Sequence, residues 1–363
     1  MRVLINTIPL LTPLTGVGNY TYSLIKEFKK LKPEFEYFYY YGYITSKFYV
    51  YNPSNAFNWS GYLKKIPLFS SIIRKLKSRC FFLQKKHFDI YFEPNFIPLE
   101  RIKAKKTIVT VHDLSFFKYP QWHPEERINY FQKNFFSRLS YANIIVTPSN
   151  FIKEELKEVM KNLRLNKEII TIYNGYDPSL FYPSAKEISK RHILFVGSIE
   201  PRKNLKSLLL AYKLLPEYLR KDFQLLIIGF KGWKNRELFD LIKNMGENVI
   251  YKGYVTKQEL ADAYRKAICL VYPSFYEGFG LPALEAIACG CPVIASSSSS
   301  LSEVLGDSGY YIDPHDIEAI AKAITDVIEK EELRLELINK GLLRAKRFTW
   351  EKSAKKYLQL FEC

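Results

Sequence analysis

Short apolar runs alternate with amphipathic stretches along the whole chain, and this alternation limits the fold more than any other feature. The runs "RVLIN" and "KTIVTVHD" predict buried strands, and "GNYTYSLIKEFKKL" between them predicts a helix. "ANIIVTPSNFIKEELKEV" predicts another strand, followed by a helix that Ser149 or Asn150 caps. Because continuous apolar strands that alternate with helices form parallel sheets covered on both faces, the predicted fold class is α/β.

The alternation starts again after a turn-rich segment, "IYNGYDPSLFYPSAKEISK", and the length of 363 residues suits two domains. Strands are predicted from "HILFVG", "FQLLIIGF", "NVIYKGYV", "ICLVYPS" and "PVIAS". We predict two Rossmann-like, doubly wound domains at 1–175 and 191–346, a linker at 176–190, and a last helix at 347–363 that returns to the first domain. Such folds bind ligands beyond the carboxyl ends of their strands, so both sheets should face one cleft.

The formal net charge of +17 predicts an acidic partner: a nucleic acid, an anionic membrane surface or a phosphorylated substrate. A surface simply rich in lysine is the alternative. The odd number of cysteines, without zinc-ligand spacing, indicates reduced thiols and a cytoplasmic protein. No apolar run is long enough to predict a membrane-spanning helix, and the first residues are typical of a strand and loop, not of a secretion signal.

Two motifs of the first half follow predicted strands. The turn "TGVGN" contains Gly16 and opens a helix, where backbone N–H groups can approach a phosphate or a ligand hydroxyl. It lacks the full G-x-G-x-x-G pattern and is also compatible with a plain turn. The second motif, "VHD", ends a strand with His112, which is either a structural or a functional histidine.

A third motif, "VGSIEPRKN", places Arg202 and Lys203 between a glycine turn and a helix. Cations are disfavoured at a helix N-terminus unless an anion is present. A diphosphate would supply that anion, with Arg202 giving a forked contact and Lys203 a point charge.

The fourth motif, "YEGFGLPALEAIACG", has Glu277 before a glycine-rich turn and Glu285 one turn into a helix. Pro282 occupies a favoured first-turn position, and the helix N-terminus would face a phosphate. Both carboxylates can then reach one bound molecule from different sides. The alternative is an exposed loop acid and a helix acid that matches the dipole. The serines at 296–300 predict a loop over the cleft.

With "GYV" and "SEVLGDSGYYIDPHD", these motifs resemble the retaining family-4 glycosyltransferases, which have the GT-B fold. The E-x7-E pair Glu277 and Glu285 is part of this resemblance, which extends over most of the chain. "TGVGNYTYSLIKEF" and "HDLSFFKYPQWHPEERINYF" resemble the bacterial O-antigen mannosyltransferase branch. The chain departs from the family at Ser298 and Ser299, near which a glycine pair is common, and at Ser302, where proline is common.

The resemblance implies a role for each motif. The catalytic residues would be Glu277, which would hold hydroxyls of the donor sugar beside the reacting carbon, and His112, which would reach that sugar from the first domain. The sequence alone also allows Glu277 to be a nucleophile. The remaining roles divide among the parts of a nucleotide sugar. They are diphosphate binding by Arg202, Lys203, Gly16 and Leu281, sugar binding by Gly278, Phe279 and Gly280, and ribose or base binding by Glu285, Gly253, Tyr254 and Val255.

The implied function is retaining transfer of a hexose, mannose from GDP-mannose, to a glycan or lipid-pyrophosphate acceptor in surface polysaccharide synthesis. A UDP-sugar donor is the alternative within the fold. A nucleotide-dependent oxidoreductase and a nucleic-acid-binding protein are the alternatives of other classes. No D-x-D motif is present, so we expect no metal and no further cofactor. The segment 61–88 has many Lys and Arg but no Asp or Glu, which predicts peripheral contact with an anionic inner leaflet or a solvated helix.

Overall fold

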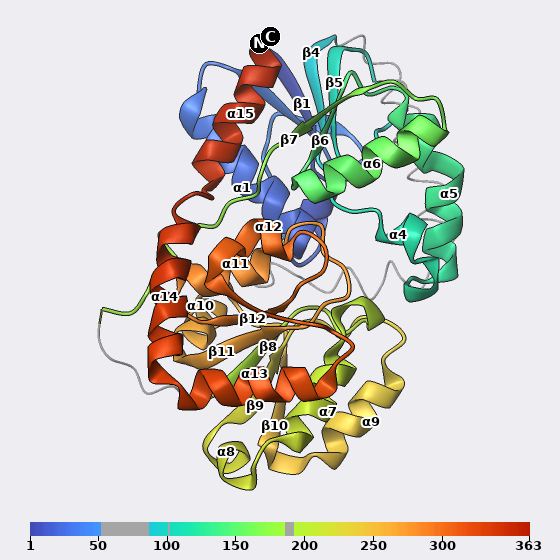
Figure 1. The fold of residues 1–363 in the computed structure, drawn as a ribbon. Coiled ribbons are helices and arrows are strands. Elements are labelled where there is room, and N and C mark those ends of the chain that lie inside the picture. Colours follow the sequence, from blue (N-terminus) through green and yellow to red (C-terminus); the bar gives the residue numbers. More distant parts are fainter. Residues whose placement is uncertain (52–86, 101, 186–191) are drawn as a thin grey trace, which may run out of the picture.

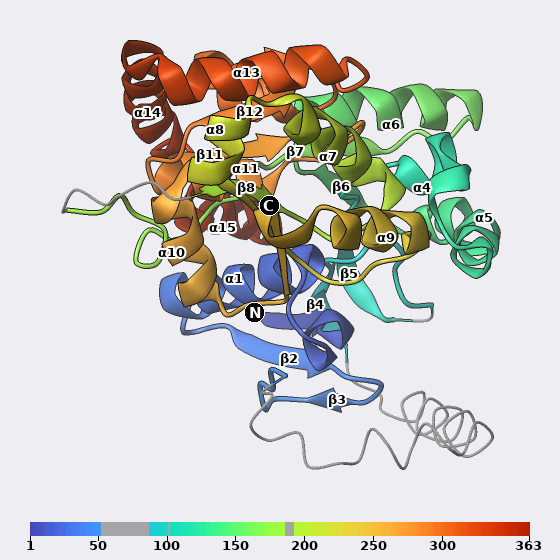
Figure 2. The ribbon, with the colours of Figure 1, turned by 90° about the horizontal axis from the view of Figure 1, so that it is seen from below.

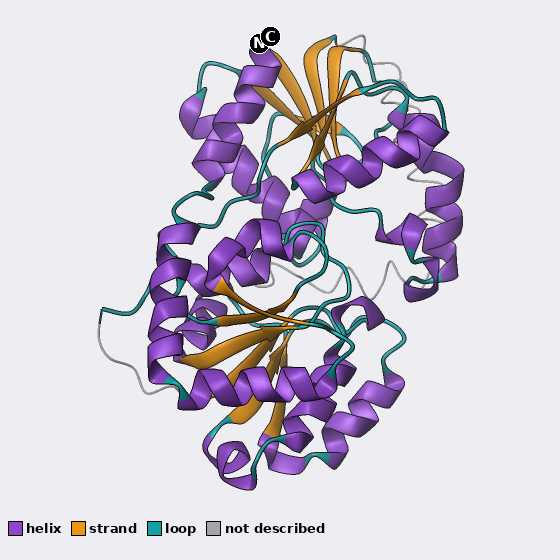
Figure 3. Cartoon of the chain, in the orientation of Figure 1, coloured by secondary structure: helices purple, strands orange, loops and turns teal. Residues whose placement is uncertain are grey.

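A computed structural model describes residues 1–51, 87–100, 102–185 and 192–363. These residues form two α/β lobes, one above the other, with helices around each sheet (Figures 1 and 3). The predicted basic segment 61–88 lies almost wholly outside the described residues. No described helix is long and apolar enough to cross a membrane.

The first lobe is built on a sheet of seven described strands. In sheet order these are β3 (Ile44–Thr45), β2 (Glu36–Tyr40), β1 (Arg2–Asn6), β4 (Phe88–Glu93), β5 (Ala104–Thr110), β6 (Ile144–Thr147) and β7 (Glu168–Thr171). All neighbours pair in parallel except β2 and β3. Seen from below, β2 and β3 lie at the outer edge of this lobe (Figure 2).

Four described helices accompany this sheet: α1 (Gly16–Leu31), α4 (Ser115–Lys118), α5 (Glu125–Leu139) and α6 (Asn150–Asn162). The apolar face of α1 buries Leu24, Ile25 and Phe28, which repeat at helical spacing. Of the two predicted caps for α6, Ser149 is the one observed, because its hydroxyl accepts the backbone N–H of Ile152.

The second lobe has a sheet of six described strands, all parallel. In sheet order they are β10 (Val249–Gly253), β9 (Gln224–Ile228), β8 (His192–Val196), β11 (Ala267–Tyr272), β12 (Val293–Ser296) and β13 (Gly309–Ile312). The described helices of this part are α7 (Leu205–Leu214), α8 (Glu217–Asp222), α9 (Arg236–Asn244), α10 (Lys257–Lys266), α11 (Leu281–Ala288), α12 (Leu301–Leu305), α13 (Ile317–Glu329) and α14 (Glu331–Ala345). Every residue of β11 is buried, as a strand covered on both faces requires.

The last helix, α15 (Trp350–Glu362), lies beside α1 in the first lobe, so both chain termini are at the same end of the molecule (Figure 1). Its Tyr357 is buried in the core of that lobe. The chain crosses between the lobes twice, once near Gly175 and again just before α15. The two crossings lie side by side, since a Cβ on Gly175 would lie 2.1 Å from the backbone nitrogen of Trp350. Only glycine allows these two connections to run so close together.

The α/β class with two largely parallel sheets confirms the fold predicted from the sequence. In both lobes, residues one or two positions after the strands line the same cavity. Examples are His112 after β5 and Pro148 after β6 in one lobe, and Gly197 after β8 and Gly229 after β9 in the other. The carboxyl ends of the two sheets therefore face each other across this space.

Candidate functional site

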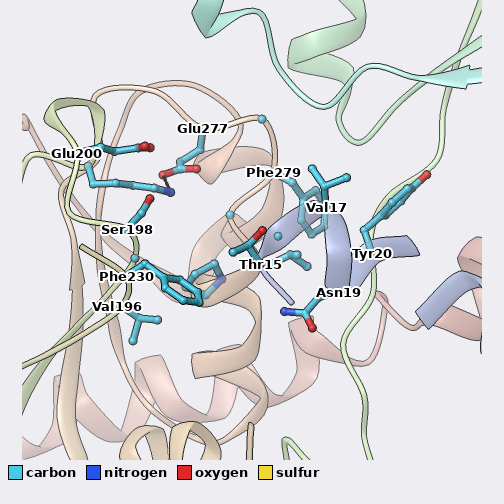
Figure 4. A pocket seen from close by; sticks show the side chains of 18 of the residues that line it. Thr15, Val17, Asn19, Tyr20, Val196, Ser198, Glu200, Phe230, Glu277 and Phe279 are labelled. Carbon is cyan, nitrogen blue, oxygen red and sulfur yellow. Dashed lines mark hydrogen bonds and ion pairs between the residues drawn. The ribbon is translucent and has the colours of Figure 1, made fainter. Parts of the chain in front are cut away.

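A cavity of about 640 Å³ lies between the lobes, a size within the range of sites for small molecules and cofactors. Figure 4 shows Ser198, Glu200 and Glu277 of the second lobe on one side, and Thr15, Val17 and Tyr20 on the other. All the predicted site residues except Gly253 line it, namely Gly16, His112, Arg202, Lys203, Tyr254, Val255, Glu277, Gly278, Phe279, Gly280, Leu281 and Glu285.

Glu277 is the centre of a buried ion-pair network. Its Oε1 accepts from Lys203 Nζ at 2.6 Å, and its Oε2 accepts from Arg202 Nη1 at 3.1 Å. Arg202 also donates through Nη2 to Glu200 Oε1 at 2.7 Å, and Lys203 donates to the hydroxyl of Tyr272 at 2.9 Å. Two cations therefore meet two carboxylates.

This network excludes one alternative that the sequence left open and changes one inference drawn from it. Glu277 is not an exposed loop acid, since only 5% of it is accessible. The cations Arg202 and Lys203 lie in a short 3-10 turn, Pro201–Lys203, ahead of α7, and the anions beside them are glutamates of the chain itself. Their position at a helix start therefore does not by itself require a bound diphosphate.

The charge state of Glu277 follows from this packing. Burial opposes ionisation, but Lys203 and Arg202 outweigh it and hold the pKa of Glu277 at about 2. Burial lowers the pKa of Lys203, against the pull of Glu277. One donor remains without a partner, because Arg202 Nε is buried and makes no hydrogen bond with the described residues. A buried N–H of this kind is suited to donate to an anionic ligand in its neighbourhood.

The hydroxyls of the serine run form hydrogen bonds to the backbone of the Glu277 loop. Ser299 Oγ accepts the backbone N–H of Glu277 at 3.0 Å, and Ser300 Oγ donates to the Glu277 carbonyl at 2.9 Å. Ser298 Oγ donates to the carbonyl of Phe275 at 3.1 Å. None of these serines is among the residues that line the cavity, so the predicted loop over the cleft supports the Glu277 loop instead.

Helix α11 begins at the cavity directly after the glycine-rich turn. Gly280 has φ of 97°, and a Cβ there would lie 2.5 Å from a side-chain carbon of Leu301. Leu281 and Pro282 form the first turn and line the cavity. The N-terminus of α11 therefore contributes partial positive charge to the same space as Arg202 and Lys203.

Glu285 lies one turn into α11, with Tyr264 and Lys257 near it. Tyr264 donates to Glu285 Oε2 at 3.2 Å. Burial raises the pKa of Glu285 to about 7, although Lys257 and Tyr264 act in the opposite direction. Beyond this acid, the rings of Phe230 and Tyr254 stack with centroids 4.5 Å apart. Gly253 contributes only its backbone there, and its carbonyl accepts from Gly229 at 2.9 Å.

His112 faces the cavity from the first lobe, between the rings of Tyr20 and Phe96. Its Nε2 lies 2.7 Å from the carbonyl of Pro94. Because a carbonyl only accepts, Nε2 carries the proton and Nδ1 is left as an acceptor. Burial lowers the pKa of His112, which favours this neutral ring.

Several cavity residues escaped prediction from the sequence. Glu200 follows β8 in the motif "VGSIEPRKN", but nothing in that motif shows that its carboxylate binds Arg202. Lys257 opens α10 and Phe230 follows β9, both at strand-to-helix junctions where a ligand-binding residue is a general expectation. Asn174 is 5% exposed, and its Oδ1 has no partner among the described residues.

Comparisons with known proteins agree with this geometry. Residues 178–344 match the family model described as Glycosyl transferases group 1, and residues 14–180 match the one described as Glycosyltransferase Family 4. The chain is 33% identical over 371 aligned residues to O-antigen chain mannosyltransferase B of Escherichia coli, with 97% of each chain covered. It is 29% identical over 239 residues to O-antigen chain mannosyltransferase RfbU of Salmonella typhimurium, which covers 64% of this chain and 62% of the relative.

Solved structures show the same architecture. Sucrose-phosphate synthase from Thermosynechococcus elongatus has a TM-score of 0.73 at 21% identity, with 99% of this chain and 98% of that chain covered. The Anabaena protein HepE, solved in complex with UDP-glucose, has a TM-score of 0.68 at 16% identity, with 100% and 99% covered. These likenesses show the fold.

The two family models and the full-length relative show that the chain is a glycosyltransferase, and its two Rossmann-like lobes have the GT-B fold. The chain belongs to the family-4 glycosyltransferases, as its motifs predicted, and a full-length relative supports that assignment along nearly the whole sequence.

Proposed function

We propose that this glycosyltransferase moves mannose from GDP-mannose to a glycan or lipid-linked acceptor in surface polysaccharide synthesis, with retention at the anomeric carbon. The observation that carries the proposal is the buried cluster of Glu277, Arg202 and Lys203 beside the N-terminus of α11, in a chain with a full-length mannosyltransferase relative. Such a cluster suits a ligand that joins a sugar to a diphosphate.

The leaving diphosphate would be held by Arg202, Lys203 and the first turn of α11. Arg202 keeps a buried Nε–H without a partner, and Lys203 has one N–H beyond those used for Glu277 and Tyr272. Donors that are already in place cost no reorganisation when charge develops on the departing phosphate. These groups supply the stabilisation for which many transferases use a metal.

Glu277 would hold hydroxyls of the donor sugar and not attack its carbon. Both of its oxygens already accept from cations, and a carboxylate with a pKa of about 2 is a weak nucleophile. The acceptor hydroxyl then attacks on the leaving-group face. The bond from the anomeric carbon to phosphate breaks, the bond to the acceptor oxygen forms, and the hydroxyl proton passes to the departing phosphate oxygen.

The other residues would read the remaining parts of the donor. Glu285 would bind the ribose hydroxyls, and the loop that contains Tyr254 and Val255 would lie against the base. His112 Nδ1 would accept from a sugar hydroxyl, because its Nε2 proton is already used. Mannose is proposed from the names of the mannosyltransferase relatives, guanosine is what the family resemblance implies, and a UDP-sugar is the alternative that the complex of HepE with UDP-glucose favours.

A panel of nucleotide sugars tests the proposal. GDP-mannose should raise the melting temperature and be turned over in excess EDTA, and UDP-glucose, UDP-galactose and UDP-N-acetylglucosamine should do neither. Stronger stabilisation and faster turnover with a UDP-sugar would show that this sugar, and not GDP-mannose, is the donor. Activity that chelator abolishes and manganese restores would overturn the metal-independent mechanism.

A further inference from the structure

Helix α12 lies near the middle of the molecule, between the two sheets (Figure 1), and it bonds to the first lobe through Glu303. The serines that precede it hold the backbone of Glu277, as described above. One turn further on, Glu303 reaches into the first lobe. Its Oε1 accepts the backbone N–H of Asn150 at 2.8 Å, and its Oε2 accepts that of Phe151 at 3.0 Å.

These two N–H groups open α6, where they have no acceptor within the helix. The N-cap Ser149 serves the third one, that of Ile152, at 3.2 Å. A carboxylate of the second lobe therefore completes the start of a helix in the first. Its negative charge also meets the positive end of the α6 dipole. The backbone carbonyl of Glu303 accepts from Arg344 at 2.6 Å, and this bond holds the backbone of Glu303 in place.

The same end of α6 touches the Glu277 loop, residues 276–280, which we call the donor loop. Ser149 Oγ donates to the carbonyl of Gly278 at 2.8 Å. Gly278 lies so close to the first lobe that a Cβ would be 1.9 Å from the carbonyl oxygen of His112. Tyr276 of the same loop donates to Glu155, farther along α6. Helix α12 thus holds the donor loop through its serines and α6 through Glu303.

We propose that Glu303 is a positioning residue, whose carboxylate holds the first lobe against the donor loop so that His112 meets the sugar-binding segment. The expected effect of Glu303 on the rate of sugar transfer rests on the proposed function. The residues proposed for the ribose and base, and most of those for the diphosphate, belong to the second lobe. Loss of this contact should therefore slow transfer and leave nucleotide affinity unchanged.

Hydrogen exchange gives a test that needs no activity. In Glu303→Gln the amides of Asn150 and Phe151 should exchange faster, and that of Ile152, which Ser149 caps, should stay unchanged. Glu318→Gln is the matched control, because Glu318 is an exposed acid in the first turn of its own helix. Unchanged exchange at Asn150 and Phe151 would show that Glu303 does not hold α6.

A backbone variant tests the same contact from the other side. Asn150→Pro removes one N–H at the first helical position, where proline is favoured. Ser149 already has the extended conformation that a following proline requires, with φ of −150° and ψ of 158°. Asn150→Ala keeps the N–H and loses the same side-chain contacts, to Tyr173 and Thr171, so it is the reference.

We expect Glu303→Gln to lower kcat/KM about tenfold relative to Glu318→Gln, as loss of one charge-assisted hydrogen bond does. The kcat/KM of Asn150→Pro should be lower than that of Asn150→Ala by a similar factor. All four variants should bind GDP like the wild type. Equal rates within each pair, or a matching loss of GDP affinity, would overturn the proposal. If exchange responds as expected but no nucleotide sugar is used, the proposed function fails and the contact stands.

Discussion

At the scale of single residues, Glu277 connects the two sites that we propose for the donor, one for its sugar and one for its diphosphate. Its carboxylate is shared by Arg202 and Lys203, the residues that we propose for the diphosphate. The cations are thus held in place and partly neutralised before a donor binds. The negative charge of Glu277 offsets the positive charge that these cations offer to a phosphate through their remaining N–H groups, so substitution of Glu277 should change GDP binding and turnover in opposite directions.

Glu277→Gln should therefore slow transfer and strengthen the binding of GDP. The neutral amide releases positive charge to the diphosphate but loses the charged contact to the sugar, a loss of about 1.5–3 kcal/mol in transition-state stabilisation. Titration calorimetry with GDP and steady-state rates measure the two effects. Lys203→Ala is the contrasting variant and should weaken both. A parallel decrease of GDP affinity in Glu277→Gln would contradict this explanation.

Glu285 predicts a dependence on pH. With a pKa raised by burial to about 7, it is protonated in part of the molecules at neutral pH. The ionised form offers more acceptors to the ribose hydroxyls, so GDP affinity should rise between pH 6 and pH 8. Glu285→Gln should bind more weakly at pH 8 and lose this rise. A wild-type affinity that is flat over this range would contradict the assignment.

The same shift affects stability. The folded pKa of about 7 exceeds the ordinary value of 4.5, so ionisation of Glu285 destabilises the fold as pH rises through this interval. The free energy of unfolding of Glu285→Gln should therefore increase relative to the wild type from pH 5 to pH 8. Denaturant titrations at the two pH values measure this difference.

At the scale of elements, the serine loop explains one departure from the family pattern. Ser299 has φ of 62°, a left-handed conformation that glycine adopts without strain. The chain has serine where glycine is common, and its hydroxyl accepts the backbone N–H of Glu277. The backbone at Ser299 is therefore strained, but its side chain makes a hydrogen bond to the donor loop.

Ser299→Gly should separate these two effects. Relief of the left-handed strain should raise stability by about 1 kcal/mol, and loss of the hydroxyl should lower kcat. Ser299→Ala loses the hydroxyl and keeps the strain, so it should be less stable than Ser299→Gly with a similar kcat. Equal melting temperatures of the two variants would contradict the strain, and wild-type rates would contradict the role of the contact.

The elements were largely predictable, and the contacts between them were not. Apolar alternation located strands such as β8 and β11, because a strand covered on both faces must be apolar throughout. Glu277 and Lys203 are 74 residues apart, so no local pattern pairs them. The serine run bonds to the Glu277 loop within the second lobe, and Glu303 bonds to α6 across the lobe boundary. Periodicity locates neither set of partners.

At the scale of the whole molecule, the basic segment 61–88 remains a prediction from the sequence. Each cation near an anionic surface contributes about 1 kcal/mol to membrane binding. Sedimentation should show stronger binding to phosphatidylglycerol vesicles than to neutral ones. Replacement of Arg74, Lys75, Lys77 and Arg79 by Gln should weaken it. Equal binding to both vesicle types, or no effect of the replacements, would show that this segment has no membrane role.

The central claim concerns both lobes together: the cavity between them transfers mannose from GDP-mannose with retention. The most direct measurement is the one-bond coupling between C1 and H1 of the transferred mannose, read by NMR from a reaction of the protein with GDP-mannose and a panel of acceptor glycans. GDP-mannose is an α-glycoside, so the account predicts an α-linked product. A β-linked product, or transfer only from a UDP-sugar, would contradict it.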